Sequence, residues 1–192
     1  LKDFSQSLPR TLVWNSAWDA ARDGETAARR YVELILANVA AESDSSVILV
    51  QLRQLATTLN FYVAEEHREQ TAVAAADRLW ELASDVPAGS DAQLQFVKSF
   101  ALLARSGSQL DRVAGLLDGS LTLEGLAVDQ DLRWELVASL VAGGRLGQAE
   151  IDAELQRDNT SSGQNAAALA KAAIPTPEAK AAAWEAIVVK GE

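Results

Sequence analysis

Apolar residues in this chain recur at intervals of three and four positions, and the longest such run is Ile48, Leu52, Leu55, Leu59 and Tyr62. This spacing puts the side chains on one face of an α-helix, whereas a half-buried strand would alternate every second residue. The sequence also contains 36 alanines, the residue with the highest helix propensity, and only 4 prolines. The pattern predicts an all-α protein.

Start and stop signals divide the periodic segments into about ten helices. The polar residues expected to cap helix N-termini are Ser7, Asp44, Ser90, either Asp129 or Asp131, Thr160 and Thr176. The glycines expected to end helices are Gly24, Gly107, Gly119 and Gly143. Residues 120–128 form the one stretch without a helical period, and we expect a connector there.

Ten helices joined by short polar turns should pack as successive antiparallel pairs. Because no identical motif recurs at a fixed period, we expect an irregular superhelix of the HEAT or armadillo type. A compact helical bundle is the alternative. No interior linker is rich enough in Gly, Pro or Ser to divide the chain, so residues 1–192 are predicted to form a single domain.

The charge and hydrophobicity of the chain limit the classes of molecule that it can bind. The 27 acidic and 17 basic side chains give a net charge of −10, which disfavours binding to a phosphate backbone. No apolar run reaches the roughly 20 residues needed to span a bilayer, and the N-terminus does not resemble a signal peptide. We therefore expect a soluble chain that binds neither nucleic acid nor membrane, and we assign it to the cytoplasm. Because the sequence has no Met and begins at Leu1, we also expect a piece excised from a longer protein.

The sequence offers little for catalysis. Its single histidine, His67, lies among acidic residues, but a zinc-binding helix needs a second imidazole four positions later, where Thr71 stands. A nucleophile elbow of the form G-x-S-x-G is absent. Asp129 and Asp131 fit helix capping better than acid–base chemistry. We expect no catalytic, cofactor-binding or metal-binding residue in this chain.

Two kinds of side chain could serve binding. The five tryptophans, at positions 14, 18, 80, 134 and 184, could form a stacking surface, but their helical context favours the core. Arg133, beside Trp134, is the one residue that we single out as peptide-facing. The alternative for Arg133 is a salt bridge to Asp129 or Asp131.

Specific strings then point to a family. The chain opens with LPRTLVW (residues 8–14), followed by WD (18–19) and RDGE (22–25). Three later strings are DQDLRW (129–134), IDAEL (151–155) leading through Asp158 and Thr160 to Gly163, and PTPEAK (175–180) leading to Trp184. Over nearly its whole length the chain resembles the C-terminal helical domain of bacterial aminopeptidase N enzymes, especially those of actinobacteria.

The resemblance implies a role without catalytic residues. In that family a preceding thermolysin-like domain carries the zinc ligands in H-E-x-x-H and binds the substrate's amino terminus through G-x-M-E-N, and neither string occurs here. The C-terminal domain covers the catalytic cleft and restricts access to peptides. The implied partners are the N-terminal catalytic domain of the same chain and its peptide substrates. The alternative is a free-standing helical-repeat adaptor that binds other proteins.

Overall fold

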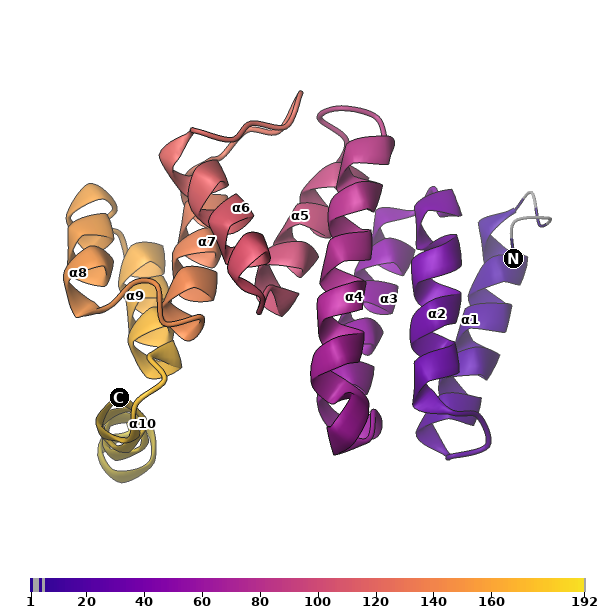
Figure 1. Cartoon of the computed structure of the whole chain (residues 1–192), viewed down its shortest axis with the longest axis horizontal. Coiled ribbons are helices and arrows are strands. Elements are labelled where there is room, and N and C mark those ends of the chain that lie inside the picture. The colour runs from indigo at the N-terminus through magenta and orange to yellow at the C-terminus, as the bar shows by residue number, and fades with distance from the viewer. Residues whose placement is uncertain (2–3, 5, 192) are drawn as a thin grey trace. The chain divides into compact units, whose positions relative to one another are not determined.

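The computed structural model describes residues 1, 4 and 6–191, and every regular element in that part of the chain is helical (Figure 1). The α-helices are α1 (Ser7–Arg22), α2 (Ala28–Asn38), α3 (Ser45–Thr57), α4 (Glu65–Asp85), α5 (Asp91–Leu103), α6 (Gly107–Asp118), α7 (Gln130–Ala142), α8 (Gln148–Arg157), α9 (Ser161–Ala173) and α10 (Pro177–Trp184). A 3₁₀ turn, η1 (Val39–Ala41), follows α2, and π-helical segments η2 (Thr58–Tyr62) and η3 (Glu185–Lys190) continue α3 and α10. The all-α prediction is confirmed.

The helices form two compact units. Unit 1 contains Leu1–Leu103 and Leu123–Leu126, and unit 2 contains Ala104–Thr122 and Ala127–Glu192. Within unit 1, α1 packs on α2, α2 on α3, and α4 along α5. Within unit 2, α6 packs on α7, α8 on α9, and α9 on both α7 and α10. Packing in successive helix pairs is therefore confirmed, while the superhelical course of the whole chain and the single domain over 1–192 stay predictions.

Most of the residues predicted to cap helix N-termini occupy the N-cap position in the structure. The Asp44 carboxylate accepts the backbone N–H groups of Ser46 and Val47, at 2.8 and 3.2 Å. Thr160 and Thr176 cap α9 and α10 in the same way. Of the two candidates for α7, Asp129 is the cap. These side chains satisfy amide donors that have no partner within the helix, which is why short polar residues mark the boundaries.

Two boundary predictions were wrong. Ser7 is the first residue of α1, and Gln6 occupies the N-cap position without a side-chain cap. Gly107 opens α6, because Ser106 and Gln109 form a capping box directly around it. The reciprocal hydrogen bonds of that box start a helix at this point, so the helix before it ends at Leu103.

The apolar face of α3 is buried as predicted for its first four members, Ile48, Leu52, Leu55 and Leu59. The fifth, Tyr62, is exposed, which contradicts the predicted face. It lies at the end of η2, where i→i+5 hydrogen bonding replaces the α-helical pattern. A wider turn rotates the following side chains away from the 3.6-residue stripe, and Tyr62 leaves the core.

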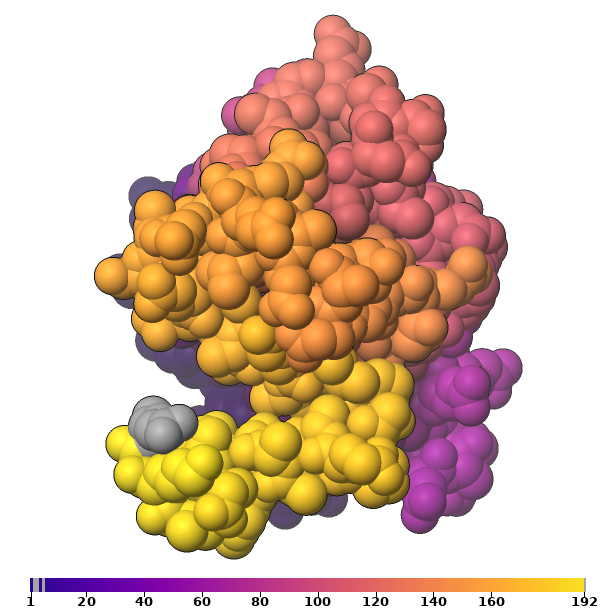
Figure 2. All heavy atoms as spheres, turned by 90° about the vertical axis from the view of Figure 1, so that its left-hand side faces the viewer, coloured from indigo at the N-terminus to yellow at the C-terminus, as the bar shows by residue number. Residues whose placement is uncertain are grey.

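The tryptophans divide between core and surface. Trp14 and Trp134 are buried. The rings of Trp18 and Trp80 pack in tilted arrangements against Tyr31 and Phe100, with centroid separations of 5.7 and 5.0 Å. Trp184 is 63% exposed, so the prediction of a core role was wrong for it. No residue of α10 is buried, and the yellow C-terminal segment that contains α10 lies on the surface of unit 2 in Figure 2. None of the described helices is both long and apolar enough to cross a bilayer.

Candidate functional site

Arg133 lies at the centre of a polar network in unit 2. From the first turns of α7, its Nε and Nη2 donate to Oε1 and Oε2 of Glu154 on α8, at 2.9 and 2.7 Å. Its Nη1 donates to the carbonyl oxygen of Leu117 at the end of α6, at 3.1 Å. A bidentate arginine–carboxylate pair combines charge with fixed geometry. The guanidinium thereby links three helices of unit 2.

The pair is largely withdrawn from water, since the side chains of Arg133 and Glu154 are 18% and 6% exposed. Hydrogen bonding to Arg133 lowers the pKa of the Glu154 carboxyl below its usual range, against the opposing effect of burial, and the Gln130 amide bond at 2.9 Å contributes in the same direction. The same pairing raises the pKa of Arg133. Glu154 is therefore ionised at neutral pH and its oxygens are occupied by donors.

The partner of Arg133 differs from the two that the sequence suggested. Asp129 uses its carboxylate to cap α7, accepting the Leu132 N–H at 2.9 Å, and Asp131 is exposed. Glu154 stands 21 residues further along the chain and reaches Arg133 because the fold brings α8 within hydrogen-bonding distance of the Arg133 side chain. A peptide-facing role for Arg133 stays a prediction.

A second carboxylate secures the neighbouring tryptophan. The indole Nε1 of Trp134 donates to Oδ2 of Asp158 at 2.8 Å, and this bond lowers the pKa of that carboxyl. The Thr160 hydroxyl donates to Oδ1 of Asp158 at 2.8 Å. Asp158 also approaches the start of α9 so closely that a Cβ at Gly163 would collide with its carbonyl oxygen and lie 2.6 Å from Oδ2. Only glycine fits at position 163 without movement of the backbone.

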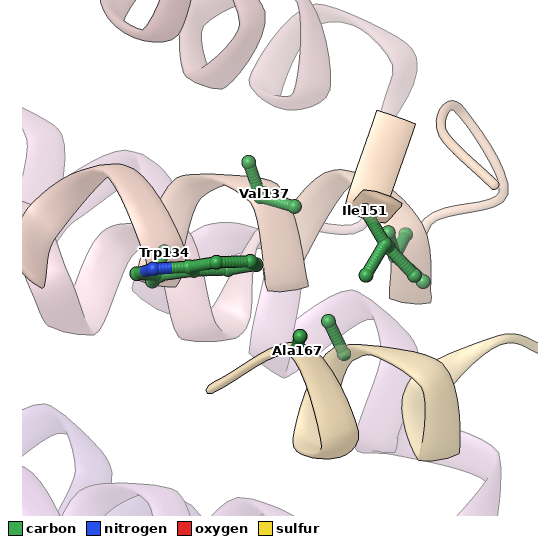
Figure 3. Close-up of a cluster of buried hydrophobic side chains, with 6 residues drawn as sticks. Trp134, Val137, Ile151 and Ala167 are labelled. Atoms are coloured by element: carbon green, nitrogen blue, oxygen red, sulfur yellow. The ribbon is translucent and has the colours of Figure 1, made fainter. Parts of the chain in front are cut away.

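The polar network rests on an apolar cluster. Figure 3 shows the Trp134 ring, Val137, Ile151 and Ala167 converging from three helices. Val141 and Ala170 complete the buried set. A buried tryptophan whose N–H has a partner contributes its full apolar area without an unsatisfied donor. The strings DQDLRW and IDAEL thus encode the joint between α7 and α8.

Unit 1 contains a network of the same kind around Glu42. Arg10 Nε donates to its Oε2 at 2.9 Å, and Trp14 Nε1 donates to its Oε1 at 2.7 Å. The Arg10 and Glu42 side chains are 7% and 1% exposed. Arg10 and Trp14 lie one turn apart on α1, and Glu42 directly follows η1. The opening string LPRTLVW therefore encodes the attachment of α1 to the segment after α2.

These arrangements suit bracing better than catalysis. The three carboxylates of these networks, Glu42, Glu154 and Asp158, each accept a hydrogen bond from an arginine or an indole. Within residues 1, 4 and 6–191, no three His, Asp or Glu side chains are grouped to hold a metal ion. His67 lies in the first turn of α4, partly exposed.

Sequence reasoning missed Glu42 and Glu154. A usable signal existed for Glu154, because it stands three residues after the core residue Ile151 and so occupies a buried face of α8. A charge at such a position requires a partner. Glu42 directly follows the 3₁₀ segment η1, and no α-helical periodicity of apolar residues marks its position.

The lowered pKa of Glu154 predicts an acid-sensitive contribution to stability. The ionised form is favoured in the folded state, so this contribution is complete above the unfolded pKa of about 4.3 and is lost as pH falls through the lower folded pKa. We expect Glu154→Gln to lower the free energy of unfolding by about 2 kcal/mol at pH 7 and progressively less below about pH 4. Denaturant titrations from pH 7 to pH 3 measure the difference. A gap between the two proteins that stays constant over this range would contradict the prediction, and the exposed Asp131→Asn controls for loss of one surface charge.

Comparison with known proteins agrees with the resemblance seen in the sequence strings. A family model described as the ERAP1-like C-terminal domain matches residues 1–192. The chain is 46% identical over 188 residues to an aminopeptidase N of Streptomyces lividans, in an alignment that covers 98% of this chain and 22% of that protein. The chain thus spans about a fifth of the length of this curated relative. Because the family model covers the whole chain, the protein belongs to the ERAP1-like C-terminal domain family.

Proposed function

We propose that this chain is the non-catalytic C-terminal domain of an aminopeptidase N-like enzyme, in which it covers the catalytic cleft and shapes the access of peptides. The observation that supports the proposal is the match of almost the entire chain to about a fifth of an aminopeptidase N. Removal of N-terminal amino acids would then be carried out by another part of the same protein. We assign catalysis to an N-terminal domain of the same protein, and this catalytic domain is the proposed partner.

Zinc belongs to the catalytic part in this proposal. A catalytic zinc site uses three protein ligands, commonly His and Glu. This sequence has one His and no Cys, and the described residues do not bring three candidate ligands together. The residues present do not fit a zinc site, and we assign no zinc ligand to this chain.

A covering domain can affect turnover without touching the reacting atoms. Contacts with remote parts of a substrate help to position the scissile bond, so their loss lowers kcat as well as binding. A long peptide can reach such contacts, whereas a single aminoacyl anilide is too short. The proposal therefore requires an effect that depends on substrate length.

Deleting this domain from the full-length enzyme should lower kcat/KM for peptides of eight to ten residues by at least about tenfold, with a much smaller effect on an aminoacyl anilide. Zinc content should remain stoichiometric, because the proposed ligands lie elsewhere. Steady-state kinetics on both substrates, with metal analysis and a thermal melt of each protein, test this expectation.

Equal losses on peptide and anilide in a folded, zinc-loaded truncation would contradict cleft covering. Loss of zinc would show instead that the domain supports the metal site. Retention of full peptide activity would favour an independent, adaptor-like role.

Arg133 remains the proposed peptide-facing residue. The guanidinium has five N–H donors, and the bonds to Glu154 and Leu117 account for three of them. In the full-length enzyme, Arg133→Ala should reduce kcat/KM for peptides by about 5- to 100-fold and leave anilide turnover nearly unchanged. Glu154→Gln is the matched variant, since it weakens the same ion pair but keeps the guanidinium. Equal effects of the two substitutions would mean that Arg133 acts only as a brace.

A further inference from the structure

The segment Leu123–Leu126, here called the strap, belongs to unit 1, although the chain on both sides of it belongs to unit 2. The polypeptide therefore passes between the units three times, after Leu103, before the strap and after it. The strap lies within the non-helical connector that joins α6 to α7. When the strap is bound to unit 1, the connector is held in place, and when it is not bound, the connector can move.

The attachment centres on one buried amide. Gln93 on α5 donates through Nε2 to the carbonyl oxygen of Glu124 in the strap and to that of Ala83 near the end of α4, both at 3.2 Å. Its Oε1 accepts the backbone N–H of Gly89 in the α4–α5 loop, at 2.8 Å. A single side chain thus holds the strap, the loop and the end of α4 together.

Two glycines let the strap approach the loop. Gly125 and Gly89 have φ values of +76° and +72°, a region that favours glycine. A Cβ at Gly125 would collide with the backbone nitrogen of Gly89 and lie 2.6 Å from the carbonyl carbon of Ala88. A side chain at position 125 would therefore push the strap off unit 1.

We propose that the strap and its Gln93 clamp form a releasable tether that restricts motion between the two units. When the strap is attached, the chain is fixed to unit 1 at each of the three points where it passes to unit 2. When the strap is released, residues 120–128 become a flexible loop. The units are then joined closely only where the chain passes from Leu103 to Ala104. Flexible loops of this length impose little restraint on their ends. The inference rests on contacts within unit 1 and the path of the chain, and it is independent of the proposed function.

The sharpest release variant is Gly125→Ala, because position 125 is exposed and the core of unit 1 is untouched. Gly24→Ala is its matched control, since Gly24 has a φ of +79° but nothing within 4 Å of an added Cβ. Both variants carry the same backbone strain, and only one displaces the strap.

The sequence has no Cys, so cysteines placed at the exposed positions Gln70 of α4 and Gln156 of α8 allow spin labels to be attached site-specifically.

Pulsed electron–electron double resonance measures the distance between the labels at positions 70 and 156. Its distribution should be about twice as broad in Gly125→Ala as in the Gly24→Ala control or the otherwise unsubstituted labelled chain. Gln93→Ala is the second release variant, and in it the Gly89 amide should lose hydrogen-exchange protection by about tenfold. Exchange of residues 121–128 reports release of the strap directly.

Release of the strap with an unchanged distance distribution would overturn the proposal, because the clamp would then order only a local loop. Failure of both variants to release the strap would overturn it as well, since Gln93 and the glycine contact would not be what holds the strap. A circular dichroism spectrum of each variant separates release from unfolding.

Discussion

Glu42→Ala should destabilise unit 1 by about 3 to 5 kcal/mol, because it leaves a buried guanidinium without its counter-charge. Glu42 accepts hydrogen bonds from Arg10 and Trp14, and both of those side chains are buried on α1. Removal of the carboxylate exposes each donor to an apolar surrounding rather than to water. Denaturant unfolding, followed by hydrogen exchange of the α1 amides, measures the loss.

Two variants separate the ion pair from other effects. Glu33→Ala, at an exposed position of α2, should change stability by no more than about 0.5 kcal/mol. The double variant Arg10→Met with Glu42→Leu should be more stable than Glu42→Ala, because no buried charge remains unpaired. A Glu42→Ala protein as stable as Glu33→Ala would show that the pair is not buried in solution.

The fold was predictable to the extent that it depends on local rules. Asp44, Thr160 and Thr176 were identified as helix starts because a cap and the amide that it satisfies lie within three residues of each other. The apolar stripe of α3 was identified for a similar reason, since a helical face is visible in consecutive residues. These signals do not depend on the tertiary structure.

Departures from the predicted helices arise where hydrogen bonding is not α-helical or where two signals compete. The π segment η2 moved Tyr62 off its stripe, and no residue type marks such a turn in advance. At Gly107 the tendency of glycine to end a helix was overridden by the capping box of Ser106 and Gln109. Gly107 does mark a helix boundary, but it begins α6 and does not end α5.

The position of Glu154 on a buried helix face indicates that it needs a partner, but which residues pair in the polar networks cannot be predicted because the partners are distant in sequence. Arg10 and Glu42 are separated by 32 residues and Arg133 and Glu154 by 21, so neither pair is visible within one helix. The sequence favours Asp129 and Asp131 as partners of Arg133 because those carboxylates are near in sequence. The family strings nevertheless contain Arg10, Trp14, Arg133 and Glu154, and the structure explains why those residue types occur there: they brace helix joints.

Leu52→Asp should unfold unit 1 or cost roughly 4 kcal/mol or more, the largest effect expected for a single substitution in this chain. Leu52 is 5% exposed in the middle of the buried face of α3, which packs against α2 and α5. The substitution removes apolar area from the core and places a carboxylate there without a designed partner. Far-ultraviolet dichroism and the melting midpoint report the loss.

Leu49→Asp on the same helix separates burial from the effect of introducing an aspartate into α3. Leu49 is 41% exposed, so the same change there should cost about 1 to 2 kcal/mol, from helix propensity and lost partial burial. Both substitutions add one negative charge to a chain that already carries −10, so the overall charge repulsion changes equally in the two variants. Their difference in stability therefore measures burial alone. Equal melts for Leu49→Asp and Leu52→Asp would mean that α3 does not present its Ile48–Leu52–Leu55–Leu59 face to the core.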